Sequence, residues 1–287
     1  MRVAITGASG FVGQRLRRAL EARGDEAVAL RIRDTTPAET ITKALEGCDA
    51  VVNLAGANIL GRWSASYKKL LYSSRIDTTR KLVEALQRCD NRPEVLLNAS
   101  AVGIYPSDME VDEFSGQYGE DFLAKLCMDW EAQANEASRF GMRVAVMRFG
   151  VIYGPGGGAM AKMMLPFRLG LGGKIGSGEQ MVSWIHVDDL VGAMFHIIER
   201  KTLSGAFNFT APYPVSNREQ TLLLADALHR PAFMSVPAFM LKLIFGEGSG
   251  VMLDSKNVQP AALLEAGYAF SYPTLDQALA AILAEEA

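Results

Sequence analysis

Residue types that mark metal sites and disulfide frameworks are scarce in this sequence. It has three cysteines and three histidines among 287 residues, with no CxxC or CxxH pair. This scarcity argues against a metal site and against a disulfide-stabilised scaffold. We therefore expect Cys48, Cys89 and Cys127 to be reduced thiols that fill small spaces in the core.

An excess of positive charge and a long apolar run are also missing. The chain has 29 basic and 32 acidic residues, a formal net charge of −3, and no cluster of basic residues such as nucleic-acid binding requires. No apolar stretch reaches the roughly 18–20 residues of a membrane span, and the N-terminus has no signal-peptide pattern. We therefore expect a cytoplasmic protein with no nucleic-acid or membrane partner.

The sequence does contain a regular alternation of short β-branched segments and longer helical segments. The expected strands cover residues 2–6, 27–32, 50–54, 95–100, 143–149 and 206–210, and the expected helices cover residues 14–23, 38–45, 78–88 and 122–140. Such alternation favours right-handed crossovers and a parallel sheet with helices on both faces. The fold class predicted is α/β, a Rossmann-type doubly wound parallel sheet.

The alternation ends near Pro155. Glycines are frequent in residues 154–158 and 170–178, and prolines interrupt the helical pattern after about residue 217. We divide the chain into an NAD(P)-binding domain, residues 1–215, with a lid-like insertion at about 154–178, and a smaller, mainly helical C-terminal cap, residues 216–287, on the substrate side.

A glycine motif, G-x-x-G-x-x-G, lies between the first expected strand and the first expected helix. Gly7 permits the tight turn, Gly10 lets a pyrophosphate approach the backbone, and Gly13 lets the helix pack closely on the sheet. The residues between them that complete the predicted cofactor contact are Ser9, Phe11 and Val12. An isolated glycine motif is weak evidence, but this one has the strand–turn–helix context that dinucleotide binding requires.

The residues after the second expected strand bear on the choice of cofactor. Arg31 and Arg33 lie on the same side of the chain and could each bind a 2′-phosphate, which favours NADP. The following Asp34 leaves NAD open, because an acidic residue here can bind the ribose 2′-hydroxyl.

Four further segments resemble the extended short-chain dehydrogenase/reductase superfamily. They are residues 53–56 (Asn-Leu-Ala-Gly), 98–105, 148–155 and 184–190, the last with the sequence Trp-Ile-His-Val-Asp-Asp-Leu. The resemblance implies that Leu54, Ala55 and Gly56 lie under the adenine and pyrophosphate, and that Phe149 and Val151 line the nicotinamide.

More narrowly, the chain resembles an atypical epimerase-like branch, whose members are described as sugar nucleotide epimerases with a small C-terminal domain of unassigned function. The matching residues include Arg62-Trp63, Ser74-Arg75, Asp129-Trp130-Glu131, residues 157–160, 167–173 and 229–233. This match covers nearly the whole chain.

In active members of the superfamily, a tyrosine and a lysine four residues later share one helix face, and a serine on the neighbouring strand end contacts the substrate oxygen. The resemblance implies that Ser100 is this serine and Lys125 this lysine, with both also touching the cofactor. Asp121 occupies the tyrosine position before Lys125, and counting instead from Tyr118 places Phe122 at the lysine position. The usual pair is therefore incomplete.

Three hypotheses remain open. The first is an NAD(P)-dependent oxidoreductase or nucleotide-sugar epimerase with a non-standard site, in which Tyr105, Tyr118 or Asp121 replaces the missing acid/base. The second is an NADP-binding sensor or regulator without turnover. The third is a structural or partner-binding role. The substrate expected is a small molecule, for which a nucleotide sugar is one candidate.

Other candidates have competing explanations. Arg62, Trp63, Arg75 and Arg168 could meet an anionic ligand, although Trp63 could equally be a packing residue. We interpret His186 and Asp189 as structural. Helices over residues 76–88 and 123–139 could pair in a homodimer, which is an analogy with the superfamily.

Overall fold

The computed structural model describes residues 1–286 and contains one central parallel sheet of six strands. In spatial order the strands are β11 (Gly205–Phe209), β6 (Arg143–Phe149), β4 (Val95–Ala101), β3 (Ala50–Asn53), β1 (Arg2–Thr6) and β2 (Glu26–Leu30). Chain order reverses between β1 and β3, so their carboxyl ends border the crevice where dinucleotides bind in doubly wound sheets. The predicted fold class is confirmed.

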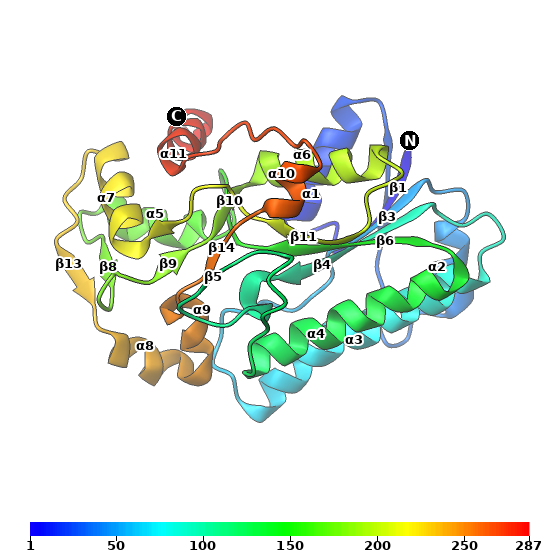
Figure 1. Cartoon of the computed structure of the whole chain (residues 1–287), viewed down its shortest axis with the longest axis horizontal. Coiled ribbons are helices and arrows are strands. Elements are labelled where there is room, and N and C mark those ends of the chain that lie inside the picture. The colour runs from blue at the N-terminus through cyan, green and yellow to red at the C-terminus, as the bar shows by residue number, and fades with distance from the viewer. Residues whose placement is uncertain (287) are drawn as a thin grey trace.

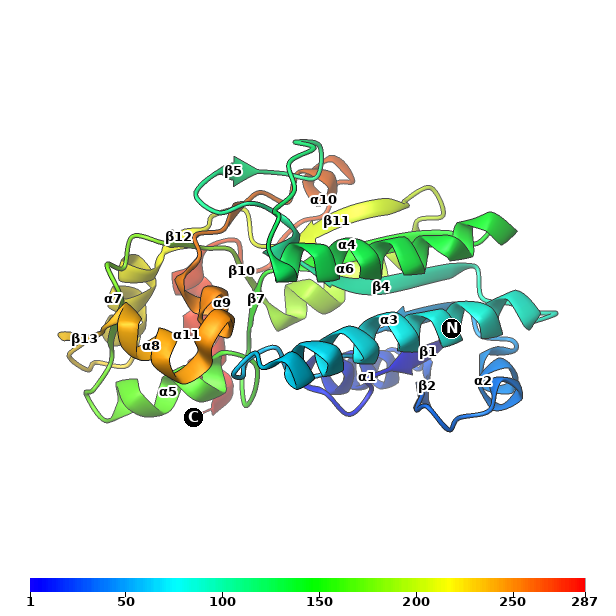
Figure 2. The ribbon, with the colours of Figure 1, turned by 90° about the horizontal axis from the view of Figure 1, so that it is seen from below.

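Helices cover both faces of this sheet (Figure 1). The helices of the sheet domain are α1 (Phe11–Ala22), α2 (Ala38–Leu45), α3 (Ala65–Arg88), α4 (Phe122–Asn135) and α6 (Val187–Glu199). Figure 2 shows α3 and α4 lying side by side, and α1 packs against α6 on the opposite face. Short 3₁₀ turns, η1 (Val102–Ile104) and η2 (Glu136–Phe140), follow β4 and α4.

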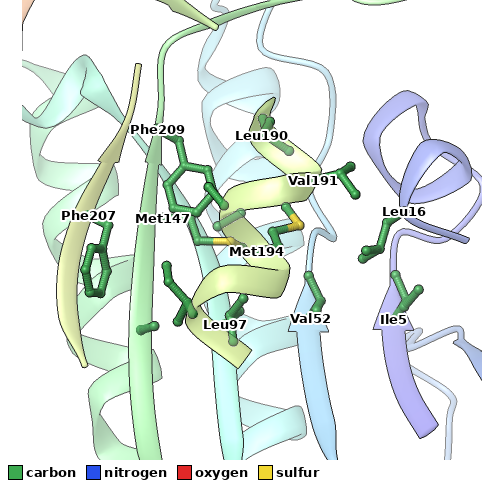
Figure 3. Close-up of a cluster of buried hydrophobic side chains, with 14 of the residues drawn as sticks. Ile5, Leu16, Val52, Leu97, Met147, Leu190, Val191, Met194, Phe207 and Phe209 are labelled. Atoms are coloured by element: carbon green, nitrogen blue, oxygen red, sulfur yellow. The ribbon is translucent and has the colours of Figure 1, made fainter. Parts of the chain in front are cut away.

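Two buried clusters explain why the strands are apolar on both faces. Val3 and Ile5 belong to the cluster beneath α1 and α6, whereas Ala4, between them, belongs to the cluster beneath α2 and α3. Figure 3 shows Met194 of α6 above the sheet side chains Val52 and Met147. Because successive strand residues point to opposite faces, both layers of helices are held by the same strands.

The second lobe combines the C-terminal region with a segment from the middle of the chain. Its helices are α5 (Met160–Arg168), α7 (Asn217–Ala227), α8 (Ala238–Phe245), α9 (Gly250–Leu253) and α11 (Leu275–Glu286), with the 3₁₀ turn η3 (Gly246–Ser249). Helix α10 (Ala261–Glu265) instead packs against β11 of the central sheet. Its short strand pairs are β7 (Val151–Tyr153) with β10 (Trp184–His186), β9 (Met181–Val182) with β12 (Val215–Ser216), β8 (Gly173–Ile175) with β13 (Met234–Val236), and β5 (Glu110–Val111) with β14 (Asn257–Val258). The predicted boundary at residues 215/216 remains a prediction.

Several helices differ from the sequence expectation: α1 begins at Phe11 rather than at residue 14, and the expected helical ranges do not include α6. Helix α3 begins at Ala65 rather than near residue 78, because Ser64 caps it by accepting a hydrogen bond from the backbone N–H of Tyr67. Helix α5 lies inside the region expected to be a glycine-rich lid, between its two glycine clusters. No helix among residues 1–286 is long and apolar enough to cross a membrane.

Candidate cofactor and ligand site

The glycine motif forms a tight cradle between β1 and α1. Gly7 has φ +66°, and a Cβ there would lie 2.8 Å from the carbonyl oxygen of Leu54. A Cβ on Gly13 would lie 2.4 Å from the carbonyl oxygen of Gly7. At Gly10 an added Cβ would meet only the Gly7 carbonyl oxygen within 4 Å, at 3.2 Å. Gly7 and Gly13 therefore close the cradle, and Gly10 leaves its ligand side open.

The amino end of α1 has the features of an anion site. Its N-cap, Gly10, provides no side-chain acceptor, and the first helical turn contains no acidic residue. The first N–H groups of a helix have no acceptor within the helix, and its dipole favours a negative charge there. The residues present thus fit the pyrophosphate of a dinucleotide.

A buried polar network fixes the floor of the cradle. The Asn53 side chain, between β1 and β4, accepts from the Thr6 hydroxyl at 2.5 Å and donates to Asn98 Oδ1 at 2.6 Å. The Thr6 oxygen also accepts from the backbone N–H groups of Leu54 and Ala55, both at 3.1 Å. These bonds hold the 54–56 turn across from the glycines.

At the adenosine end, Arg31 and Arg33 follow the last residue of β2 and are both exposed. At the other end, Phe149 and Val151 are half-buried beside the junction of β6 and β7. These four residues therefore lie at the carboxyl edge of the sheet, at the ends of β2 and β6.

Phe11 connects the cradle to the glycine-rich segment after β7. A Cβ added at Gly157 would lie 2.1 Å from a ring carbon of Phe11, and Cβ atoms at Gly154 and Gly158 would lie 2.9 and 3.0 Å from the same ring. The glycines of the predicted lid therefore allow the backbone to lie directly on the Phe11 ring.

A buried ion pair lies beside the carboxyl end of β4. The serine at that end is itself buried rather than exposed to a substrate. Ser100 is 2% exposed and donates its hydroxyl proton to Glu131 Oε1 at 2.6 Å. Arg148 of β6 forms a two-pronged ion pair with Glu131 of α4, at 2.9 and 2.8 Å. A serine hydroxyl has one proton, so Ser100 can only accept a further hydrogen bond in this arrangement.

Tyr105 belongs to the same network. Its hydroxyl donates to Asn208 Oδ1 at 2.8 Å and accepts from Arg148 Nη1 at 2.7 Å, and the residue is 1% exposed. Burial raises the pKa of Tyr105 to about 12, against the opposing effect of Arg148. A phenol with this pKa stays protonated at neutral pH and is poorly suited to act as a base.

The other candidates for acid/base chemistry lie elsewhere. Lys125 is exposed on α4. Asp121 caps α4 by accepting from the N–H of Ala124 at 2.8 Å, and Tyr118 is 48% exposed. The thiol of Cys127, two residues beyond Lys125, lies beside Ser100. The structure therefore does not bring Lys125 together with Ser100, because two helical residues correspond to about 200° of rotation.

Lys256, which the sequence analysis did not single out, reaches this region from the C-terminal lobe. Its Nζ donates to the carbonyl oxygen of Tyr105 at 2.7 Å, and Ser183 donates to the Lys256 carbonyl at 2.7 Å. Burial lowers the pKa of Lys256, against the opposing effect of nearby Asp254 and Asp121. No local motif marks this lysine, since only the fold brings it to the end of β4.

A cavity of about 560 Å³ is lined by Asp254, two residues before this lysine. Residues from three parts of the chain line it, among them Asp108, Gln180, Lys242 and Asp254. Asp108 and Asp254 also contribute to the electrostatic environment of Lys256. The cavity therefore lies between the loop after β4 and the C-terminal lobe.

The residues expected to meet an anionic ligand make internal contacts. Arg62 donates to the Leu243 carbonyl at 3.0 Å, and Arg168 pairs with Glu286 at 2.6 Å. The Trp63 ring packs edge-on against Phe122 at 5.4 Å. Arg75, like Arg62, forms no ion pair among residues 1–286, and its side chain donates to the carbonyls of Leu71 and Ala57.

His186 and Asp189 have structural contacts. Nδ1 of His186 accepts from the N–H of Asp188 at 3.2 Å and so caps α6. Asp189 accepts from the N–H groups of Ser271 and Tyr272 at 2.7 and 2.9 Å. Both observations agree with the structural interpretation. Cys48, Cys89 and Cys127 are free and buried, and no cluster suited to a metal occurs within residues 1–286.

Comparison with known proteins identifies the family. The model of the NAD dependent epimerase/dehydratase family matches residues 3–209, and that of a domain of unknown function, DUF1731, matches residues 236–282. The chain belongs to the NAD dependent epimerase/dehydratase family. This confirms the epimerase-like resemblance and the presence of a separate C-terminal domain of unassigned function.

Individual relatives agree with this assignment. The chain is 39% identical to the chloroplastic SDR39U1 homolog of Arabidopsis thaliana, an epimerase family protein, over 99% of this chain and 87% of the relative. The crystal structure of human epimerase family protein SDR39U1 with NADPH superposes with a TM-score of 0.90 at 37% identity, covering 98% of this chain and 99% of that one. MoeE5 in complex with UDP-glucose and NAD has a TM-score of 0.78 at 20% identity, covering 99% and 98%, and supports the fold alone.

Proposed function

We propose that this protein binds NADP(H) and acts on a small molecule as an epimerase- or oxidoreductase-like enzyme with a non-standard acid/base set. The observation that carries the cofactor assignment is the open amino end of α1, closed on its other sides by Gly7 and Gly13. The human relative crystallised with NADPH supports the same assignment. NAD remains the alternative cofactor.

In this proposal each group of predicted residues binds a different part of the cofactor. Residues 7–13 hold the pyrophosphate, residues 54–56 lie along the adenosine half, and Phe149 with Val151 lines the nicotinamide. Arg31 and Arg33 bind the 2′-phosphate, since guanidinium groups match phosphate geometry. The bound nicotinamide would supply hydride-transfer chemistry.

Replacement of Gly10 tests the cradle. We expect Gly10→Val to weaken NADPH binding by at least roughly a hundredfold, because the side chain fills the space of the pyrophosphate and blocks several charge-assisted hydrogen bonds. Gly10→Ala, which adds only the Cβ, should cause a smaller loss. NADPH fluorescence titration measures both, and thermal unfolding checks that the variants fold. Wild-type affinity in a folded Gly10→Val protein would refute the cradle.

For the chemistry, we propose that Lys256 rather than Lys125 donates to the ligand oxygen. An ammonium group has three N–H donors, and Lys256 uses one of them on Tyr105 among the described residues. Ser100 orients the ligand by accepting a hydrogen bond, and the Glu131–Arg148 pair fixes Ser100. A nucleotide sugar is one proposed substrate class, because the chain belongs to the NAD dependent epimerase/dehydratase family.

A sensor without turnover is the second candidate. It is favoured by the burial of Ser100 and Tyr105 in a network that leaves neither one poised to donate a proton to a ligand. Purified protein with NADPH should be offered carbonyl compounds and nucleotide sugars, with nicotinamide absorbance and product stereochemistry as readouts. Turnover that is lost in Lys256→Met but kept in Lys125→Met supports the enzyme. Tight NADPH binding with no turnover on the panel supports the sensor.

Localisation in the cytoplasm and assembly as a homodimer remain predictions. Fractionation of cells and light scattering of the purified protein measure them directly.

A further inference from the structure

The turn after β2, residues 33–36, is held by a lysine from a distant helix. The backbone N–H of Thr36 donates to the Arg33 carbonyl at 3.1 Å, which closes the turn. Lys81 of α3 donates to the carbonyls of Arg33 and Asp34 at 3.2 and 3.0 Å, and to the carboxylate oxygen of Asp34 at 3.4 Å. All three ammonium protons of Lys81 are thereby directed at this turn.

The acidic residue near this turn has an ion-pair partner, whereas the two basic residues have none in the part of the chain that the structure describes. Arg31 and Arg33 form no ion pair with any residue in the range 1–286. Asp34 is paired with Lys81, while its own side chain is fully exposed. The Lys81 side chain is 26% exposed, but the Asp34 carboxylate lies fully in solvent, so water and salt screen the pair. Lys81 therefore offsets part of the charge of the acidic group that could bind a ribose 2′-hydroxyl, whereas the two basic groups have no ion-pair partner within residues 1–286.

We propose that Lys81 is a cofactor-specificity residue, which favours NADPH over NADH by offsetting the negative charge of Asp34 beside the 2′-phosphate site. This inference rests on the proposed binding of NADP(H) at the cradle. Without Lys81, the Asp34 carboxylate repels the 2′-phosphate, which only NADPH carries. NADH has a neutral hydroxyl at that position, so its affinity depends little on the charge of Asp34.

The experiment compares NADPH and NADH affinities in two single variants and one double variant. Lys81→Met should weaken NADPH binding about fivefold, the size expected for one solvent-screened charge at close range, and leave NADH binding within about twofold. Lys69→Met is the matched control, because Lys69 is an exposed lysine of the same helix about 18 Å away along its axis. It should change neither affinity.

The double variant Lys81→Met/Asp34→Asn tests whether the loss comes from the charge of Asp34 or from removal of the Lys81 side chain itself. It should regain most of the lost NADPH affinity, because the repelling carboxylate is gone. An unchanged NADPH-to-NADH preference in Lys81→Met, or a double variant no better than the single one, would overturn the assignment. A wild-type protein that binds no NADPH would instead refute the proposed function, so the two failures are distinguishable.

Discussion

The glycine cradle and the end of β4 lie on the same edge of one sheet but use their polar groups in opposite ways. At the cradle, the N–H groups that open α1 have no side-chain acceptor. At the end of β4, the Ser100 hydroxyl and the Tyr105 hydroxyl already donate to Glu131 and Asn208. The N–H donors at the cradle are therefore free for a ligand, whereas the hydroxyl protons at the end of β4 already have acceptors within the protein.

This difference has a physical cause in the kind of polar group that each region presents. Free backbone donors at a helix end cost little in water and form strong bonds with an anion. A buried Arg–Glu pair, by contrast, needs hydrogen bonds on every remaining atom, and Ser100 and Tyr105 supply them. The groups that would ordinarily touch a substrate therefore stabilise the β4–β6–α4 junction.

The largest effect expected at the end of β4 comes from breaking the Glu131–Arg148 ion pair. Glu131→Ala leaves the Arg148 guanidinium buried without its carboxylate, and we expect a loss of about 3–5 kcal/mol in the free energy of unfolding. Urea denaturation measures this loss. NADPH affinity of the folded fraction should stay near that of the wild type, because the cradle is untouched.

An exposed pair provides the control. Glu94 pairs with Lys201 at 2.9 Å, with both side chains well exposed. Glu94→Ala should cost no more than about 1 kcal/mol, as is usual for surface pairs. Equal losses in the two variants would show that the Glu131–Arg148 pair is not an important structural element.

A smaller effect is expected from removing one hydroxyl of the same network. Tyr105→Phe leaves Arg148 Nη1 and Asn208 Oδ1 each without one partner, and unsatisfied buried groups cost about 1–3 kcal/mol. Because the folded pKa of Tyr105 is raised to about 12, the native state retains this proton longer than the unfolded chain. The stabilisation from Tyr105 is therefore full below pH 10 and is lost as the pH rises toward 12.

Unfolding free energies at pH 8 and pH 11 test this statement. The gap between wild type and Tyr105→Phe should narrow at pH 11. A gap that widens at pH 11 would mean that the phenolate is the form stabilised in the folded protein, and Tyr105 would again be a candidate base.

The fold could be read from the sequence where local pattern and tertiary packing agree. Strand β6 and helix α2 match their expected bounds, because a buried β-branched run and an amphipathic octet leave few alternatives. Helix α3 was expected to be thirteen residues shorter, since its first turns carry lysines and serines and are held by the Ser64 cap. Helix α5 lies between glycine clusters that also fit a loop.

The candidate site was less predictable for a different physical reason. The cradle is local, because its three glycines and its helix are contiguous. Lys256 and Lys81 act on residues more than forty positions away, the Tyr105 carbonyl and the 33–36 turn, and no spacing rule reveals such contacts. Lys125 was chosen by counting along α4, whereas the rotation of that helix directs Cys127 toward Ser100.

The smallest expected effect tests which residue of α4, Lys125 or Cys127, faces the site. Lys125 is exposed, and it forms no ion pair with any residue from 1 to 286. Lys125→Met should change the free energy of unfolding by no more than about 0.5 kcal/mol, as is usual for surface substitutions, and leave the NADPH affinity unchanged. Lys125→Arg is the charge-conserving control. A clear loss of NADPH affinity in Lys125→Met, absent in Lys125→Arg, would mean that this side chain turns toward the cofactor when it binds. The end of β4 would then be a site whose side chains reach their working arrangement only when the ligand binds.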